Sequence, residues 1–300
     1  MSAQNDIAVL ANPRAGRGRH RGLLPAVLER LGAAGRTVRL LEAGSGEEAE
    51  KACRQAVAEG LGALVVVGGD GTVHRALQAV ATTPVGFGVV PAGTGNDFAA
   101  GTGVPSAPLK AAEAIAAAIR DQRDRAVDLA RVTTAEGDVH WFGAVLAAGF
   151  DAIVNERANR MRRPRGPRRY DLAILLEMAR LRPRRYTLVL DGADRSLTGV
   201  LVAIGNCRSY GGGLLICPDA DPADGLLDVV VAASLGRGAL IRLKPRLRRG
   251  THLSDPRVAA YTAREVRIEA DGIIAYADGE RIAALPLLVS CIPGAVRLLG

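Results

Sequence analysis

Aromatic residues, lysine and cysteine are scarce in this chain of 300 residues. Aromatics make up 3% of the chain and apolar residues 48%, so aliphatic side chains and alanine must fill the cores of a folded protein. The four cysteines form no C-x-x-C pair, which argues against a zinc site and favours buried free thiols in a reducing cytoplasm. No apolar run approaches the roughly 20 residues of a membrane-spanning helix. The first residues also lack the charged and apolar regions of a signal peptide.

Lysine occurs only three times, so arginine carries the positive charge, and it does so unevenly. The chain nets +8, whereas residues 157–185 alone hold eleven Arg against one Asp and one Glu, a net of +9. A second basic cluster covers residues 244–249. These segments are either solvated helix faces or contact surfaces for anionic lipid headgroups or nucleic-acid phosphates. Because aromatic residues hardly interleave with the arginines, nucleic acid is the less favoured partner.

The first 125 residues alternate between apolar strands and helices, a pattern typical of a parallel sheet covered on both faces. Strands are predicted at 7–11, 37–41, 63–67 and 85–90, and helices at 23–31, 47–59, 73–81 and 109–121. Beyond residue 125, short strands with a period of two predict an antiparallel sandwich. Those strands are expected at 127–133, 186–191, 197–204, 227–232, 266–268 and 273–277, interrupted by helices near 154–161, 170–181 and 237–247.

Three glycine-bearing loops follow strands of the first half: NPRAGRGR at 12–19, GGDGT at 68–72 and PAGTGNDFA at 91–99. Ligands of parallel sheets bind at the carboxyl ends of the strands, where these loops converge. GGDGT is not a Walker A motif, because no lysine follows its glycines. Its glycines predict a nest of backbone N–H groups that holds phosphate at a helix N-terminus, with Asp70 acting through a divalent cation. The alternative is a tight turn in which Asp70 caps the helix.

These three loops, in this order, resemble the nucleotide-binding domain of the diacylglycerol-kinase-type lipid kinases. That family includes bacterial soluble diacylglycerol kinases and sphingosine kinases and is distantly related to NAD kinases. The stretch GNCRSYGGGLLICPDADPADGLLDVVV and the later YADGER at 276–281 resemble motifs of its second half. The resemblance implies a Rossmann-like parallel α/β domain at 1–125 that binds ATP and an antiparallel β-sandwich domain at 126–285. The tail, 286–300, is expected to pack back on the first domain.

The family's site residues carry over to matching positions of this sequence. The resemblance implies that Glu280 is the general base of catalysis and that Asp70 and Asp97 belong to a network of water and Mg²⁺. The nucleotide-binding positions are Asn12, Pro13, Arg14, Ala15, Gly16, Gly68, Gly69, Asp70, Gly71, Thr72, Val73, His74, Arg75, Gly93, Thr94 and Asn96. The resemblance also implies a structural Mg²⁺, with Asp224 and the backbone carbonyls of Asp221 and Leu226 as its ligands.

Four features of these motifs leave alternatives open or depart from the family's pattern. Asp278-Gly279-Glu280 also reads as a hairpin turn, which would present Glu280. His74 stands where the family usually has Asn, and the loop after residue 41 lacks the Thr that many relatives place near the nucleotide. Gly211, Gly212 and Gly213 either pass close to a ligand or form a turn.

The leading functional hypothesis is an ATP-dependent kinase of a membrane lipid with a free hydroxyl, most simply diacylglycerol, giving phosphatidic acid. It would be a cytoplasmic protein in peripheral contact with an anionic membrane, with a homodimer as one possible assembly. Alternatives are a kinase of another acceptor, such as a sphingoid base or NAD, and a nucleotide-binding regulator without catalysis.

Overall fold

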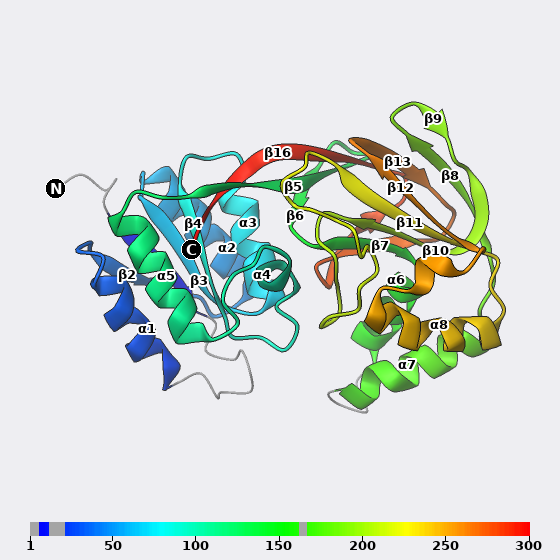
Figure 1. The fold of residues 1–300 in the computed structure, drawn as a ribbon, viewed down its shortest axis with the longest axis horizontal. Helices are drawn as coiled ribbons and strands as arrows, with labels where there is room; N and C mark the ends of the chain where they lie inside the picture. Colours follow the sequence, from blue (N-terminus) through cyan, green and yellow to red (C-terminus); the bar gives the residue numbers. More distant parts are fainter. Residues whose placement is uncertain (1–5, 12–21, 162–166) are drawn as a thin grey trace. The chain divides into compact units, whose positions relative to one another are not determined.

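The computed structural model describes residues 6–11, 22–161 and 167–300, and Figure 1 shows the course of the chain. The chain divides into two compact units. Unit 1 consists of Met1–Leu129, Pro222–Asp224 and Ile292–Gly300, and unit 2 of Ala130–Asp221 and Gly225–Cys291.

Unit 1 is built on a parallel sheet whose strand order is β2-β1-β3-β4-β16. The strands are β1 (Ile7–Ala11), β2 (Val38–Leu41), β3 (Ala63–Gly68), β4 (Gly86–Pro91) and the end of β16 (Leu287–Leu299). Alternate residues of β3 point to opposite faces, yet every residue of this strand is buried. Both faces of the sheet are therefore covered, as the unbroken apolar run in the sequence predicts.

Five helices of unit 1 connect and cover these strands: α1 (Leu23–Gly32), α2 (Gly46–Ala58), α3 (Asp70–Val80), α4 (Asp97–Gly101) and α5 (Pro108–Arg120). Residues Val27 and Leu31 of α1 and Ile115 of α5 join one apolar core with the strand residues Val9 and Val65. Helices α2 and α3 pack on one another. Figure 1 shows the pair α1 and α5 and the pair α2 and α3 on different sides of the strands.

Unit 2 is an antiparallel sandwich. One sheet has the order β15-β14-β7-β10-β11-β12, and the other contains β8, β13 and the first part of β16, with β9, β5 and β6 at its edges. The strand bounds are β5 (Arg125–Thr134), β6 (Val139–Phe142), β7 (Val145–Gly149), β8 (Arg184–Leu190), β9 (Ala193–Asp194), β10 (Leu197–Gly205), β11 (Leu227–Ala233), β12 (Val258–Ala263), β13 (Glu265–Glu269), β14 (Ile274–Ala277) and β15 (Glu280–Ala284). Side chains from both sheets, among them Leu146, Leu188, Val229 and Val266, fill one core.

Unit 2 also carries the helices α6 (Phe150–Arg160), α7 (Pro167–Ala179) and α8 (Arg237–Arg249) and a short 3₁₀ turn, η3 (His252–Ser254). No helix within the described residues combines the length and the apolar character needed to cross a bilayer. The predicted fold class, a parallel α/β domain followed by an antiparallel β-sandwich, is confirmed.

The predicted bounds were wrong at three helix starts, one of them that of α7, which begins at Pro167 and not near residue 170. The helix predicted at 73–81 begins at Asp70, because Gly69 is extended (φ −104°, ψ −171°) and its carbonyl already accepts the N–H groups of Thr72 and Val73. The helix predicted near 154–161 begins at Phe150, directly after β7. After β7 the last strand residue, Gly149, is followed directly by helical backbone, and after β3 only Gly69 separates the strand from the helix.

Candidate active site

The order of the unit 1 strands fixes where a ligand would bind. Strand β1 lies between β2 and β3, so the chain turns in opposite directions after β1 and after β3. Such a switch point opens a crevice at the carboxyl ends of the strands. The loop after β1, which carries Asn12, Pro13, Arg14, Ala15 and Gly16, lies outside the described residues, so its predicted role stays a prediction. The GGDGT segment comprises the end of β3, Gly69 and the first turn of α3, and the segment after β4 carries Gly93–Asp97.

The glycines of these loops serve close packing, and Gly68, Gly69 and Gly93 do so without a positive φ. A Cβ on Gly93 would lie 2.4 Å from the Cα of Gly69, and a Cβ on Gly69 would lie 2.8 Å from the Cα of Gly93. A Cβ on Gly68 would meet the side chain of Thr72 at 2.6 Å. The two loops therefore touch backbone to backbone, which only glycine permits.

Asp70 holds the two loops together. Its two carboxylate oxygens accept the backbone N–H of Asn96 at 2.8 Å and that of Asp97 at 2.7 Å. The alternative interpretation, in which Asp70 caps its own helix, is wrong, because no side chain caps the start of α3. Asp70 instead binds the first N–H groups of α4, a helix start that otherwise lacks a side-chain cap.

Asn96 shapes the second loop from within. Its backbone is left-handed (φ 57°, ψ 40°), a conformation that asparagine tolerates better than most residues. Its side-chain oxygen accepts the N–H of Gly93 at 2.9 Å, and its amide donates to the Gly93 carbonyl at 3.3 Å. Thr94 at the tip of this loop is exposed, and Asp97 is buried. Thr94 is thus accessible to a ligand, while Asn96 keeps the loop in shape.

Six of the predicted nucleotide-binding residues lie on α3, and three of them, Val73, His74 and Arg75, differ in access. Val73 and His74 are both 4% exposed, so a ligand would reach their backbone and not their side chains. Arg75 is half-buried, and its guanidinium lies 3.4 Å from the carboxylate of Glu50 on α2. His74, which replaces the family's usual Asn, therefore has a buried side chain. The replacement affects the packing of α3 more directly than the edge of the sheet where a ligand would bind.

In unit 2, Asp278 and Gly279 form the predicted hairpin turn between β14 and β15, with φ values of 52° and 83°. These values are typical of the turn that D-G favours. The Asp278 carboxylate accepts the N–H groups of Gly143 and Ala144 at 3.0 and 2.9 Å. Glu280 is the first residue of β15 and is half-buried. The predicted turn is thus confirmed, and the role of Glu280 stays a prediction.

A polar cluster surrounds the same hairpin within unit 2. The Tyr276 hydroxyl on β14 donates to the Glu156 carboxylate on α6, which also binds Arg160 at 2.6 Å and Arg281 at 3.5 Å. Hydrogen bonding to Tyr276 lowers the pKa of Glu156. These contacts tie α6 to the hairpin. Sequence reasoning missed them, and the only available signal was the helical spacing of Glu156 and Arg160.

Asp151 at the start of α6 lies in a less polar setting. One carboxylate oxygen accepts the N–H of Ala152 at 3.0 Å, and the other is buried with no hydrogen-bond partner among the described residues. Burial raises the pKa of this carboxyl to about 6. Sequence reasoning also missed Asp151, because nothing in the local pattern distinguishes it from an exposed helix-start carboxylate.

The predicted metal ligands lie on the loop before β11. Asp221 and Asp224 are exposed, Leu226 is half-buried, and Gly225 is left-handed with a φ of 75°. Across the described residues, no group of three or more His, Cys, Asp and Glu side chains is placed to hold a metal. A cation on this loop would therefore depend on backbone carbonyls and water, as the prediction for Leu226 already requires.

Comparison with known proteins covers both units. Residues 6–132 match the diacylglycerol kinase catalytic domain, and residues 144–300 match the YegS C-terminal NAD kinase beta sandwich-like domain. A curated protein from Mycobacterium tuberculosis named diacylglycerol kinase is 42% identical over 294 residues, which are 98% of this chain and 94% of that protein.

Two solved structures share the fold. A diacylglycerol kinase from Bacillus anthracis str. Sterne superposes with a TM-score of 0.73 at 20% identity, covering 98% of this chain and 96% of that one. An NAD kinase from Archaeoglobus fulgidus in complex with ATP superposes with a TM-score of 0.53 at 14% identity, covering 98% and 92% of the two chains. With both halves matched in order, the chain belongs to the diacylglycerol kinase family of lipid kinases, and it is a phosphotransferase with an alcohol group as acceptor.

Proposed function

We propose that this kinase transfers the γ-phosphoryl group of ATP to the free hydroxyl of diacylglycerol and so produces phosphatidic acid. The observation that carries the proposal is the 42% identity to a protein named diacylglycerol kinase, which extends over 98% of this chain. The identity extends over both units, so it includes the proposed donor-binding part in unit 1 and the proposed acceptor-binding part in unit 2.

The donor half of the proposal rests on the carboxyl edge of the unit 1 sheet. Phosphoryl transfer needs mainly alignment and charge neutralisation. The N-terminus of α3 begins directly after Gly69, and a helix N-terminus attracts phosphate. Asp70 fixes this terminus against the loop that carries Thr94, so two loops form one rigid edge. We assign nucleotide binding to this edge, together with the predicted residues 12–16.

Magnesium fits this edge by the chemistry of its donors. Carboxylate oxygens suit a hard cation, and Mg²⁺ commonly binds one or two carboxylates, several waters and the nucleotide phosphates. Asp70 and Asp97 supply such oxygens from two adjoining loops. Bound Mg²⁺ would offset the negative charge of the phosphates. Asp221, Asp224 and the Leu226 carbonyl remain the proposed ligands of a second, structural ion.

Glu280 is the proposed general base. The acceptor hydroxyl is a weak nucleophile until a carboxylate within hydrogen-bond reach takes its proton. As that proton passes to Glu280, the hydroxyl oxygen forms a bond to the γ-phosphorus, and the bond from that phosphorus to the bridging oxygen breaks to release ADP. The Asp278–Gly279 turn supports this role, because it is anchored to Gly143 and Ala144 and holds the next residue in place.

A cavity inside unit 2 favours a lipid acceptor over NAD. Its volume is about 230 Å³, and it lies among α6, the end of α7 and the strands β8 and β10. Its apolar lining comes from Phe150, Ile153, Leu181, Tyr186 and Val200. The ion pair between Arg157 and Glu177 lies at the same cavity. An apolar cavity with a charged margin suits an acyl chain and not a dinucleotide.

Two helices of unit 2 support peripheral contact with an anionic membrane. Leu175 on α7 is 66% exposed, and Ile241 on α8 is 57% exposed. Helix α8 carries six Arg and Lys in thirteen residues and no Asp or Glu. Exposed aliphatic side chains beside basic ones are typical of helices that lie in a membrane interface. Each basic residue near such a surface contributes about 1 kcal/mol.

The acceptor is tested with labelled ATP, Mg²⁺ and mixed micelles that contain diacylglycerol, a sphingoid base or neither, and with NAD in solution. We expect labelled phosphatidic acid as the main product. Labelled sphingoid phosphate or NADP as the main product would replace diacylglycerol by that acceptor. No phosphorylated product from any acceptor would refute the proposal.

Membrane contact is tested by flotation with vesicles of phosphatidylcholine alone or mixed with phosphatidylglycerol. We expect binding to the anionic vesicles only, and a loss of several-fold or more in Ile241→Asp. Leu40→Asp is the matched control, because Leu40 is an exposed leucine of unit 1, 44% exposed, and lies on strand β2. Equal binding of both variants would exclude α8 as the contact.

A further inference from the structure

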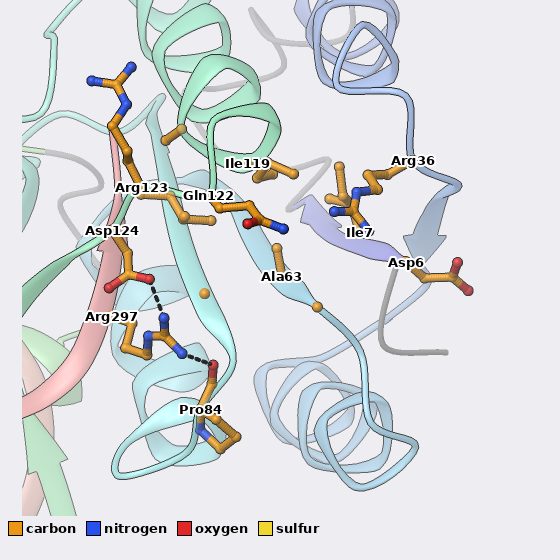
Figure 2. A pocket seen from close by; sticks show the side chains of 14 residues that line it. Asp6, Ile7, Arg36, Ala63, Pro84, Ile119, Gln122, Arg123, Asp124 and Arg297 are labelled. Carbon is orange, nitrogen blue, oxygen red and sulfur yellow. Dashed lines mark hydrogen bonds and ion pairs between the residues drawn. The ribbon is translucent and has the colours of Figure 1, made fainter. Parts of the chain in front are cut away.

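A second cavity lies within unit 1, at the edge of the sheet where the strands begin. Its volume is about 410 Å³, within the range of small-molecule sites. It is lined by the first residues of β1, β3 and β4, by the end of α5 and the turn after it, and by β16. Figure 2 shows this cavity with its lining side chains. Nothing in the proposed kinase reaction uses it.

The floor of the cavity is apolar and its margin is charged. Ile7, Ala63, Ile119 and Leu299 supply apolar surface. The margin carries three arginines, Arg36, Arg123 and Arg297, and two aspartates, Asp6 and Asp124. A small ligand with an apolar body and an anionic end would match both features.

Two of the three guanidiniums already have acidic partners. Arg297 binds Asp124 at 2.5 Å and also donates to the carbonyl of Pro84 at 3.3 Å. Arg123 binds Asp121 at 2.6 Å. Within the part of the chain that the structure describes, the guanidinium of Arg36 has no hydrogen-bond or ion-pair partner. Figure 2 shows the carboxylate of Asp6 directed away from Gln122 and Arg297, and the carboxylate of Asp124, which also lines the cavity, bound to Arg297.

Gln122 adds an independent observation, because its backbone is strained. It follows the C-cap of α5 with a φ of 51°, and the N–H of Arg123 bonds back to the carbonyl of Ala118 at 2.8 Å. This is the helix ending in which glycine normally occupies the left-handed position. A residue with a side chain is held there at a cost in stability. Strain of this kind concentrates at functional sites.

The side chain that this strain positions lies over the cavity. The Gln122 amide has no partner among the described residues, and in Figure 2 it extends toward the same space as the Arg36 guanidinium. An amide and a guanidinium together offer several N–H donors. Donors that converge on a cavity without an acceptor of their own are the chemistry of an anion site.

We propose that this cavity binds a small anion with a phosphate or carboxylate group, held by Arg36 and Gln122, with Arg297 at the opposite margin. The occupant is distinct from the phosphoryl donor. The cavity lies at the amino ends of β1 and β3, whereas the glycine loops follow their carboxyl ends. A strand of this length separates the two edges by roughly 17–20 Å. The bound anion would therefore occupy unit 1 at the same time as a nucleotide.

The test is calorimetric titration with inorganic phosphate, and separately with malonate, of protein saturated with a non-hydrolysable ATP analogue. We expect one of the two anions to bind saturably while the analogue is present. Arg36→Gln should weaken that binding by about tenfold or more, since a charge-assisted bond is lost. Arg54→Gln is the matched control, because Arg54 is an exposed arginine of α2 outside the cavity, and it should bind as wild type does.

Gln122→Gly separates a binding role from a folding role. Relief of the left-handed strain should raise the unfolding temperature by about 2–4 °C. The same substitution removes the amide, so the affinity for the anion should fall. A more stable protein that binds the anion less well would support the site. No saturable binding of either anion beside the ATP analogue, or equal binding by Arg36→Gln and Arg54→Gln, would overturn it.

Discussion

Asp70 of unit 1 and Asp278 of unit 2 have the same structural role in different surroundings. Each carboxylate accepts two consecutive backbone N–H groups of a distant segment, at 2.7–2.8 Å for Asp70 and 2.9–3.0 Å for Asp278. Each also stands beside a glycine. Gly69 has an ordinary φ but no room for a Cβ, whereas Gly279 has room but a φ of 83°. A glycine beside an aspartate of a family motif can therefore serve packing in one unit and turn geometry in the other.

The largest expected effect comes from Gly93→Ala, which fills the contact between the two glycine loops. The new methyl group would meet the Gly69 backbone, which has no side chain that can yield. We expect a loss of about 2–3 kcal/mol in the free energy of unfolding, together with weaker ATP binding. Gly279→Ala strains one turn but meets no atom within 4 Å, so it should cost only about 1 kcal/mol. Urea unfolding and nucleotide titration of both variants measure these effects, and equal losses would contradict the distinction.

Asp70→Asn and Asp278→Asn should come next in size. In each variant one N–H faces the amide nitrogen in place of an oxygen, and we expect a loss of about 1–2 kcal/mol. The two should differ in function. Asp70→Asn should weaken ATP binding, because it loosens the edge where the nucleotide is proposed to bind. Asp278→Asn should keep wild-type affinity for ATP and lower turnover through Glu280. Titration of a fluorescent ATP analogue distinguishes them, and weaker ATP binding in Asp278→Asn alone would reverse the assignment.

Asp151 sharpens the comparison, because only one of its oxygens has a hydrogen-bond partner. Burial raises the pKa of this carboxyl to about 6, so the folded protein disfavours its charged form. Stability contributed by Asp151 is therefore complete below the pKa of the unfolded chain, near 4, and is lost as pH rises to about 6.

Asp151→Asn should accordingly gain about 1–2 kcal/mol relative to wild type between pH 4 and pH 7. Thermal unfolding across this range checks the prediction. Asp194→Asn is the control with the opposite sign, because hydrogen bonds from Ser196 lower the pKa of Asp194. Parallel pH profiles for the two variants would show that Asp151 titrates as an ordinary exposed carboxyl.

Strands and helices of unit 1 were predictable because each is specified by its own residues. The run Leu64–Val67 and its following glycines identify a buried strand and a loop without any other information. The hydrogen bonds that Asp70 accepts were not predictable, because the donor residues lie 26 and 27 residues further along the chain. The contact between Gly69 and Gly93 was hidden for the same reason, and it changes the meaning of those glycines.

Unit 2 was harder to predict, because antiparallel pairing depends on distant segments. Strand β7, VLAAG, is buried throughout and so lacks the alternation that marks the half-exposed strands. Unit 1 holds a similar case, because strand β16 continues there through Pro293 and Gly294, which would normally end a strand. Gly294 has a φ of 60°, and its N–H is bound by the buried carboxylate of Asp128 at 2.7 Å. This hydrogen bond supports the strand at Gly294, and the sequence alone does not indicate it, because Asp128 lies far from Gly294 in the chain.

The central claim is that Glu280 deprotonates the hydroxyl of diacylglycerol, and one comparison tests it directly. Wild type and Glu280→Gln are assayed for labelled phosphatidic acid formed from ATP and diacylglycerol micelles, with Glu269→Gln as the control, since Glu269 is an exposed strand glutamate of the same unit. We predict product from wild type and from the control, and a turnover at least about a hundredfold lower in Glu280→Gln with an unchanged unfolding temperature. Wild-type turnover in Glu280→Gln, or no phosphatidic acid from wild type, would contradict the claim.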